Sequence, residues 1–262
     1  MAPIRKIEDI YVTQSMMKAW SSGICPLVFK AMWIDETVSF TPSEMMMYGN
    51  YFEHQAIGAT MTGKAPELTD KMKKSVYFER IQSQVQKWHE IVREMKITNI
   101  APQRSVEGVI NFDYDSNVLP VKVKGHFDVD CLVDGVPTII DLKLTGNVNN
   151  MYGDYSWGDP GSMDLKQSIH YKMLKKMVDG VMPQFMYFVF DITPDLGVKI
   201  IRADIREVSF DAHQKEIFVM WNEIVYGLMN GFEAKPKYTD CISCPVKCPM
   251  MMKVPEIETV EI

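Results

Sequence analysis

The chain has 262 residues, of which 47% are hydrophobic and 24% are charged, and its formal net charge is −6. This composition is that of a soluble globular protein with a substantial core. The acidic balance argues against nonspecific coating of nucleic acid, although it does not exclude a local basic channel. Because no apolar run reaches the roughly 18–20 residues of a membrane helix and residues 1–6 lack the apolar stretch of a signal peptide, we expect a cytoplasmic protein with no membrane partner.

The first hundred residues are predicted to be mostly helical. Helical spacing over 10–34 breaks once and resumes at Pro26, which suits the first turn of a helix. Ser43 is a favourable N-cap for a second helix that ends near Gly58. Apolar residues at helical spacing then predict one long helix over about 68–95.

Strands dominate the middle of the chain. The segment 184–192 is almost entirely apolar, as in a strand that is covered on both faces. A strand, helix, strand order implies a right-handed parallel crossover, so we expect an α/β fold with a mixed central sheet. The expected elements are, in order, strands at 104–112, 119–133 and 136–145, a loop at 146–161, a helix at 162–178, strands at 184–192 and 198–208, and a helix at 210–230.

The dipeptide Asp134-Gly135 between two β-rich segments organises this sheet. Both residues of a tight hairpin turn need positive φ, which makes Asp-Gly a strong hairpin signal. If these two residues form the turn, counting backward places Asp128 directly opposite Asp141, with Cβ atoms about 4.5–5.5 Å apart. The other face is predicted to be buried and to carry Phe127, Val129 and Cys131 against Leu142, Ile140 and Thr138.

Two carboxylates on one face of a sheet repel each other unless a positive charge lies between them. A Mg²⁺ or Mn²⁺ ion between Asp128 and Asp141 meets this need, because hard cations prefer carboxylate oxygens and keep several waters. Lys143 points to the same face, where its ammonium can orient or activate a water held at the ion. The alternative is an ordinary surface hairpin with acidic residues on its wet side.

Four further residues are candidates from helices. Gln167 and Tyr171 are four residues apart and therefore share one face of the helix predicted at 162–178. Glu53 and His54 lie on an earlier helix, from which one of them can supply a further metal ligand. Taken alone, the first pair fits a plain amphipathic helix, and the second pair fits surface or capping residues.

The cysteines form a more specific pattern. Cys241, Cys244 and Cys248 lie within one short segment, and Cys25 precedes a proline more than two hundred residues earlier. Four thiolates suit either a tetrahedral Zn²⁺ site or an iron–sulfur cluster, and an odd count of five cysteines argues against a disulfide framework. Cys131 is expected to be a core residue.

Together these motifs resemble those of RecB-type nucleases of the PD-(D/E)XK superfamily, in the iron–sulfur branch that includes the CRISPR adaptation exonuclease and the AddB nuclease domain. Two positions depart from the family pattern. The helical Gly-x-x-x-His motif has Glu53 four residues after Gly49, with His54 one beyond, and the last cysteine gap is shorter than the usual five residues. The matching segments are residues 15–29 with the first cysteine, Gly125-His-Phe-Asp128, Ile139-Ile-Asp-Leu-Lys143, Gln167-x-x-x-Tyr171 and the C-terminal cysteine trio.

The resemblance implies a restriction-endonuclease-like core in a single domain. It divides the chain into a helical part at 1–100, a catalytic sheet core at 101–208, and a C-terminal helix with a cysteine loop at 209–262. The resemblance also assigns roles. Metal would be bound by Asp128, Asp141, the backbone carbonyl of Leu142, and Glu53 in preference to His54. Lys143 would serve the attacking water, and Gln167 and Tyr171 would contact DNA and support the site. A 4Fe–4S cluster, with Zn²⁺ as the alternative, would be held by Cys25, Cys241, Cys244 and Cys248.

The activity implied is that of a Mg²⁺- or Mn²⁺-dependent DNA exonuclease, acting on single-stranded ends in recombination or repair. Recombination or replication proteins, or a second copy of the chain, are the expected partners. Two other functions stay open. One is a catalytically silent DNA-binding or assembly module of a recombination or integration complex, and the other is a zinc-stapled endonuclease.

Overall fold

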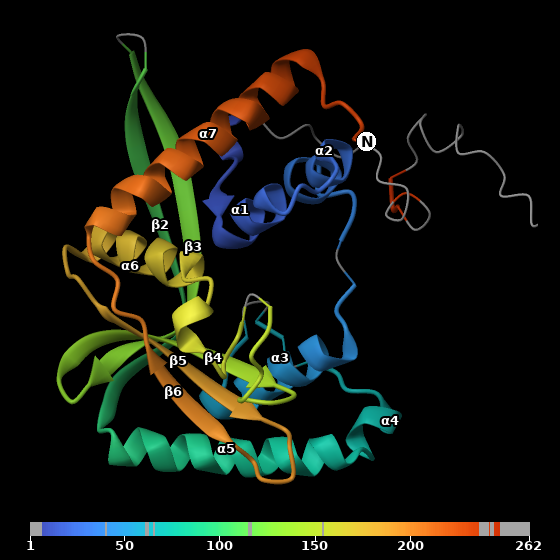
Figure 1. The fold of residues 1–262 in the computed structure, drawn as a ribbon, viewed down its shortest axis with the longest axis vertical. Coiled ribbons are helices and arrows are strands. Elements are labelled where there is room, and N and C mark those ends of the chain that lie inside the picture. The colour runs from blue at the N-terminus through green and yellow to red at the C-terminus, as the bar shows by residue number, and fades with distance from the viewer. Residues whose placement is uncertain are drawn as a thin grey trace, which may run out of the picture. The chain divides into compact units, whose positions relative to one another are not determined.

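The computed structural model describes residues 7–39, 41–60, 63–64, 66–114, 117–153, 155–235, 241 and 244–246, without the side chain of residue 114. The described elements follow one another as drawn in Figure 1: η1 Ile7–Asp9, β1 Val12–Thr13, α1 Gln14–Ser21, α2 Pro26–Phe29, a π-helical turn η2 Lys30–Ile34, α3 Glu44–Ile57, α4 Asp70–Lys73, α5 Val76–Glu94, β2 Ile97–Tyr114, β3 Asn117–Val133, β4 Val136–Thr145, η3 Pro160–Ser162, α6 Lys166–Asp179, β5 Gln184–Asp191, β6 Val198–Arg202 and α7 Val208–Asn230.

These elements group into two compact units, each built from separate segments of the chain. Unit 1 comprises Met1–Thr41, Asn111–Lys122 and Glu216–Ile262, and unit 2 comprises Pro42–Ile110 and Val123–Lys215. The long strands β2 and β3 and the helix α7 each run from one unit into the other. The predicted single domain, with parts that meet at residues 100 and 208, stays a prediction.

The described strands form one six-stranded sheet in the order β1-β3-β4-β5-β6, with β2 also paired to β3. β3 and β4 are antiparallel, β4 and β5 are parallel, and β5 and β6 are antiparallel. Helix α6 lies between β4 and β5 in the chain, so it makes the connection that two parallel strands require. The predicted mixed α/β architecture is confirmed.

The hairpin that joins β3 and β4 turns where the sequence predicts. Asp134 and Gly135 both have positive φ, of 47° and 80°. Val133 pairs with Val136, and five consecutive residue pairs keep the predicted register. The Asp-Gly turn therefore fixes which residues of the two strands face each other.

One face of the sheet in unit 2 packs against α3 and α5 (Figure 1). The hairpin contributes Val129, Cys131, Ile140 and Leu142 to this hydrophobic cluster, as predicted. Even-numbered residues of β5 join the same cluster. Cys131 is buried at 4% exposure, and it therefore acts as a core side chain.

Helix α6 covers the opposite face. The ring of Phe185, an odd-numbered residue of β5, lies 6.3 Å from the ring of Tyr171 on α6. Phe127 lies on this side too, because its ring centroid is 5.2 Å from that of Tyr171. The prediction that grouped Phe127 with Val129 is therefore wrong. The regular alternation of faces along β3 changes between these two residues.

Several predicted boundaries shift for local reasons. Ser43 caps α3 by accepting from Met46 N, as predicted. The long helix predicted over 68–95 is instead two helices, α4 and α5, because the Ser75 hydroxyl caps a new helix by accepting from Tyr77 N. Helix α6 begins at Lys166 rather than 162, where the Asp164 carboxylate accepts from the Lys166 backbone N.

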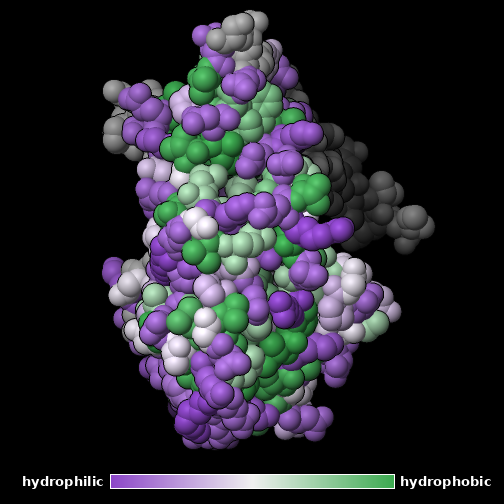
Figure 2. All heavy atoms as spheres, turned by 90° about the vertical axis from the view of Figure 1, so that its left-hand side faces the viewer, coloured by the Kyte–Doolittle hydropathy of each residue, from purple (hydrophilic) through white to green (hydrophobic). Residues whose placement is uncertain are grey.

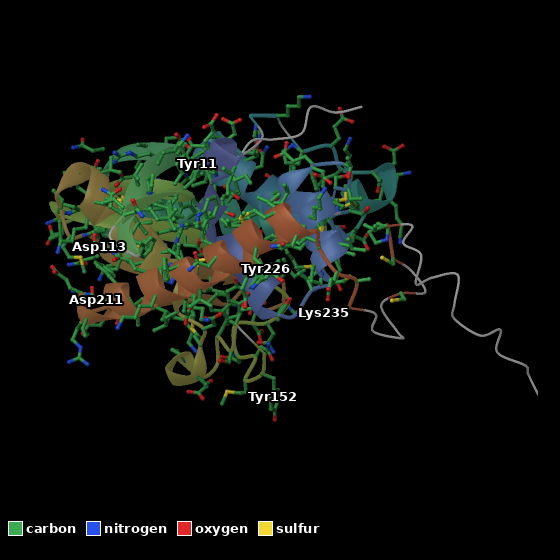
Figure 3. The ribbon with its side chains drawn as sticks, turned by 90° about the horizontal axis from the view of Figure 1, so that it is seen from above. Tyr11, Asp113, Tyr152, Asp211, Tyr226 and Lys235 are labelled. Atoms are coloured by element: carbon green, nitrogen blue, oxygen red, sulfur yellow. The ribbon has the colours of Figure 1, made fainter. Side chains whose placement is uncertain are left out.

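The strand boundaries also differ. β2 begins at Ile97 rather than at residue 104, since pairing with β3 extends it across Asn99 and Pro102, two residues that are poor strand formers. β6 ends at Arg202 rather than at residue 208. The loop predicted at 146–161 is present, and Tyr152 within it points outward at 82% exposure (Figure 3).

The surface carries hydrophobic side chains in small groups among polar ones, on the face drawn in Figure 2. Scattered apolar residues of this kind are normal on a folded protein. Among the described helices, none is both long enough and apolar enough to cross a membrane.

Candidate active site

The candidate site begins where β3 and β4 leave the paired part of the hairpin. The last recorded pair is Val129 with Ile140, and the next positions on the two strands are Asp128 and Asp141. Asp128 Oδ2 accepts a hydrogen bond of 2.9 Å from the backbone N of Leu142. The Asp128 carboxylate therefore lies against the backbone of β4, at the residue that follows Asp141.

Asp141 is 1% exposed and is held from two sides. Gln167 Nε2 on α6 donates a 2.8 Å hydrogen bond to Oδ1. Lys143 Nζ lies 2.5 Å from Oδ2 and forms an ion pair with it, and Oδ2 has no other hydrogen-bond partner among the described residues. A buried carboxylate oxygen thus has an ionic neighbour and an open lone pair.

Gln167 and Tyr171 lie on one face of α6, as their spacing predicts. The Tyr171 ring packs against β3, and Gly125 makes this close approach possible. A Cβ at Gly125 would lie 3.1 Å from the Tyr171 ring and 2.8 Å from Leu174 Cδ1. The glycine of the Gly125-His-Phe-Asp128 segment therefore has a packing reason, because it lets α6 sit against the strand that carries Asp128.

Glu53 extends from α3 into the electrostatic field of the same site. Burial, together with the charges of Asp128 and Asp141, raises the pKa of Glu53 to about 8, against the opposing effects of Lys143 and of a hydrogen bond from Gln103. Gln103 on β2 donates a hydrogen bond to Glu53 Oε1. Glu53, the preferred candidate of the pair Glu53 and His54, therefore interacts electrostatically with the two aspartates, although among the described residues the three carboxyl groups do not gather closely enough to bind one ion.

His54 has a different neighbour. Its Nδ1 lies 3.3 Å from Gln55 Nε2, within its own helix. Sequence reasoning missed Gln103, the partner of Glu53. The sequence around Gln103 gives no sign of this contact. In the structure the backbone of Gln103 has a φ of 50°, which is unusual for a residue other than glycine.

The charges at the site do not balance by themselves. Burial, together with the charge of Asp141, raises the pKa of Asp128 to about 7. Burial also raises the pKa of Asp141, against the opposing effect of Lys143. Burial alone would lower the pKa of Lys143, but Asp141 and Asp128 outweigh it and raise that pKa. One ammonium therefore faces two aspartates and Glu53, and the site can accept more positive charge.

A divalent cation fits this arrangement. Among the described residues, no three Asp, Glu, His or Cys side chains gather closely enough to form a metal site by themselves. Mg²⁺ requires less, because it is usually bound by one or two carboxylates and keeps several waters. The carboxylates of Asp128 and Asp141 meet that requirement, and Asp141 Oδ2 has a lone pair that no hydrogen bond uses.

Comparison with known proteins supports the fold. No family model matches this sequence, and no curated protein matches it either. A crystal structure of a candidate exonuclease from Eubacterium rectale is similar, with a TM-score of 0.60 and 14% identity over 96% of this chain and 90% of that one. The chain has a nuclease-like fold. The structure of SSO0001 aligns with a TM-score of 0.30 and 14% identity, over 74% of this chain and 84% of that one.

Beyond the predicted residues, this nuclease-like core contains an ionic network that sequence reasoning missed. Lys175 on α6 contacts both carboxylate oxygens of Asp130, at 2.7 and 2.6 Å, and it reaches Asp179 at 3.1 Å. Arg104 on β2 donates to Asp179 with two bonds of 2.7 Å and also contacts Asp130. The network fastens α6 to β2 and β3 and so fixes the helix that presents Gln167. No spacing in the sequence marks this network, because its members come from three separate segments of the chain.

The predicted cluster cysteines are only partly described. Cys248 lies outside the described residues. Cys25, Cys241 and Cys244 are free thiols of unit 1 and are partly exposed. Cys244 N donates a 3.3 Å hydrogen bond to Cys241 O. Their assignment to a cluster stays a prediction.

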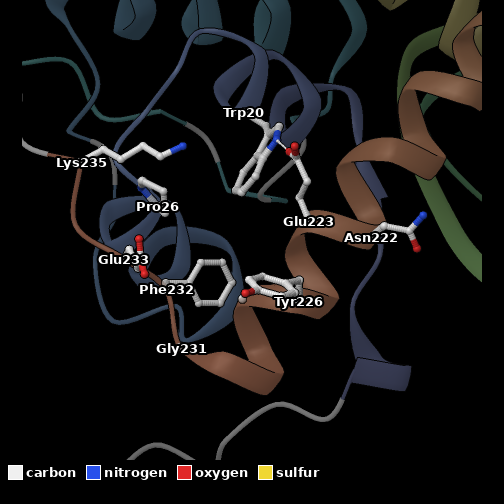
Figure 4. Close-up of a pocket in the computed structure, with 10 residues that line it drawn as sticks. Trp20, Pro26, Asn222, Glu223, Tyr226, Gly231, Phe232, Glu233 and Lys235 are labelled. Carbon is white, nitrogen blue, oxygen red and sulfur yellow. Dashed lines mark hydrogen bonds between the residues drawn. The ribbon is translucent and has the colours of Figure 1, made fainter.

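Unit 1 also has a pocket of its own, of about 400 Å³ (Figure 4). Trp20 Nε1 donates a 2.6 Å hydrogen bond to Glu223 Oε2 at its rim. Tyr226 and Phe232 lie side by side across from Trp20. The Phe232 ring rests on Gly227, where a Cβ would lie 2.7 Å from that ring. Sequence reasoning gave no sign of this pocket.

Proposed function

We propose that this protein is a metal-dependent deoxyribonuclease that degrades single-stranded DNA from its ends, as a RecB-type member of the PD-(D/E)XK superfamily. One observation carries the proposal. Buried Asp141 is oriented by Gln167 and neutralised in part by Lys143, with Asp128 beside it. The nuclease-like fold supports this proposal, because the candidate exonuclease shares it over nearly the whole of both chains.

The cation would be Mg²⁺ or Mn²⁺, held by Asp128, Asp141 and the carbonyl of Leu142, and Glu53 would complete the set by moving toward the ion when it binds. When bound, such an ion polarises a phosphodiester and lowers the pKa of the attacking water. Glu53, with its raised pKa, would come to the ion ionised because the ion favours the charged form of a carboxyl group.

Lys143 would serve as a fixed positive charge. Asp141 and Asp128 raise the pKa of Lys143, so its amine is protonated near neutral pH in the metal-free site. It can donate hydrogen bonds to a phosphate oxygen and stabilise the charge that develops there. Gln167 holds one oxygen of Asp141 in place. Burial raises the pKa of Tyr171, so that side chain stays neutral and supports the helix face.

The nuclease proposal is tested on a 5′-end-labelled single strand with Mn²⁺. Lys143→Ala and Asp141→Asn should each lower the cleavage rate by about 100-fold or more, the usual cost of removing a group that stabilises transition-state charge. Lys176→Ala, which alters a partly exposed lysine on α6, is the matched control and should retain wild-type activity. Wild-type rates in both site variants would contradict the assignment.

Two further results separate the alternatives. A circular single strand should resist an enzyme that needs ends, so its rapid cutting would favour the endonuclease. Binding of single strands without any Mn²⁺-dependent degradation by the wild type would favour the silent DNA-binding module.

We further propose that Cys25, Cys241, Cys244 and Cys248 hold a 4Fe–4S cluster. The cysteine spacing supports this proposal, and so does the partial exposure of the three described thiols, which leaves them accessible to a ligand. Anaerobically purified protein should be brown and contain iron and sulfide, and Cys25→Ser should bleach it. A colourless protein that contains one zinc ion would assign the site to Zn²⁺ instead.

A further inference from the structure

A pocket of about 360 Å³ opens in unit 2 at the carboxyl ends of the parallel strands β4 and β5. Gly146 directly follows β4 and Thr193 follows β5, while α3 and α5 supply the other walls. Ligands of open α/β sheets bind at the carboxyl ends of the strands. The volume lies in the range of about 300–1,000 Å³ that is typical of small-ligand pockets.

The aromatic side chains of this pocket form a supported platform. Tyr48 is 2% exposed, and its hydroxyl donates a 3.2 Å hydrogen bond to Met72 O. Tyr77 is 41% exposed and meets the edge of Tyr48, with ring centroids 6.0 Å apart at 80°. A fixed inner ring therefore steadies an outer ring that reaches solvent. Exposed aromatic rings of this kind stack nucleobases with little sequence preference.

The charged groups of the pocket suit a nucleotide better than a free ion. Arg80 lies 6.0 Å from the centroid of the Tyr77 ring and donates 2.7 Å from Nη1 to Ile192 O. That bond uses one of the five N–H donors of a guanidinium group. Glu44 is the acidic residue of the lining and balances Arg80, so the lining carries no net charge. A stacked base with one phosphate contact fits this combination.

Two separate elements lead from the candidate active site to this pocket. Asp141 and Gly146 are five residues apart along β4, which is about 16 Å at the rise of a strand. Glu53 and Glu44 are nine residues apart on α3, which is about 14 Å at the rise of a helix. Because α3 packs on β4, both estimates describe the same distance, which is about 15 Å from the candidate active site to the pocket. A stacked strand advances about 3.4 Å per nucleotide, so about four or five nucleotides span this distance.

We infer that this pocket holds a base of the single-stranded substrate about four or five nucleotides from the bond that is cleaved. Tyr77 stacks on the base, and Arg80 contacts the adjoining phosphate. The inference rests on the proposed function, and it adds that this enzyme binds its strand at two places and therefore favours strands long enough to reach both.

Substrate length tests the inference. Tyr77→Ala and Arg80→Gln should each lower kcat/KM on a single-stranded 20-mer by about tenfold, the usual loss for one stacked base. Both should leave kcat/KM on a trinucleotide within about twofold, because a trinucleotide cannot span the two places. Arg93→Gln is the matched control, since Arg93 is exposed on the same helix about 20 Å from Arg80. Equal losses on both substrates would overturn the inference.

A third variant fills the pocket without removing a contact. A side chain at Gly146 meets no atom within 4 Å of its Cβ, so Gly146→Phe should fold and block the space. It should reproduce the loss on the 20-mer and spare the trinucleotide. Wild-type rates on both substrates with Gly146→Phe and Tyr77→Ala would overturn the pocket while leaving the nuclease assignment intact.

A binding assay separates the two proposals. In EDTA, with a fluorescent single-stranded 20-mer, Tyr77→Ala and Gly146→Phe should weaken binding about tenfold relative to the wild type. If the two variants bind DNA more weakly but the wild type cleaves no DNA, the pocket is a DNA-binding site and the proposed nuclease activity is wrong. Unchanged binding in both variants would overturn the pocket whether or not the wild type cleaves DNA.

Discussion

The substitution Asp128→Asn should stabilise the protein at pH 8 when no metal is present. The pKa of Asp128 is raised to about 7 by burial and by Asp141, compared with about 3.9 in an unfolded chain. At about 1.4 kcal/mol per pKa unit, ionising this partly buried group costs up to about 4 kcal/mol of unfolding free energy. Asn keeps the hydrogen bond from Leu142 N but gives up the attraction of Lys143. We therefore expect a gain of roughly 2 kcal/mol.

The pH dependence of this gain has a definite sign. Between about pH 4 and pH 7 the folded wild type keeps a proton on Asp128 that the unfolded chain has released. This group therefore makes the wild-type free energy of unfolding fall as the pH rises through that window. Asp128→Asn lacks this contribution, so the two proteins should have equal stability near pH 4 and differ most at pH 8.

Urea unfolding in EDTA at pH 4.5, 6 and 8, followed by tryptophan fluorescence, measures the effect. Asp113→Asn is the control, because Asp113 is exposed on β2 (Figure 3) and its neutralisation should change stability by less than about 0.5 kcal/mol. A ligand at one hundred times its Kd stabilises the folded state by about 2.7 kcal/mol, so Mn²⁺ should stabilise the wild type more than Asp128→Asn. An Asp128→Asn protein no more stable than the wild type at pH 8 would refute the reasoning.

Two further predictions concern the helix α6. Lys175→Met removes the ammonium group that neutralises buried Asp130 and should lower the unfolding free energy, measured in urea, by about 3 kcal/mol. Lys176 is partly exposed, so the control Lys176→Met should lower it by less than about 1 kcal/mol. Equal losses in the two variants would show that the network does not stabilise the fold. Gly125→Ala crowds the Tyr171 ring and should lower the free energy of unfolding by about 1–3 kcal/mol. The rate of DNA cleavage should fall as well, because the ring moves. Wild-type activity of Gly125→Ala in steady-state assays would show that the position of the Tyr171 ring does not matter for cleavage.

The hairpin with its two aspartates was predictable because its signals are local. The pair Asp134-Gly135 supplies the positive φ of the turn, and the period of two in a strand then assigns every residue to a face. The same reasoning failed at Phe127, where β3 departs from strict alternation. No signal in the sequence marks that position, since the packing of α6 against the strand decides it.

The partners of the acidic residues were harder to predict. Gln103 reaches Glu53 from a strand that begins seven residues before its predicted start, and Lys175 reaches Asp130 from the helix α6. Such contacts depend on how distant segments pack, which composition and spacing do not encode. Spacing did identify Gln167, because four residues on a helix return to the same face.

The division of the chain has a consequence for its synthesis. Unit 1 combines Met1–Thr41 with Asn111–Lys122 and Glu216–Ile262, so the first segment leaves the ribosome long before the last one. At about 5–20 residues per second, the roughly 175 intervening residues take about 10–35 seconds to translate. During that interval Met16 and Phe29, which are buried in the finished protein, lack the segment that completes their unit. Newly made chains should therefore depend on chaperones more than a protein of this size whose parts fold in order.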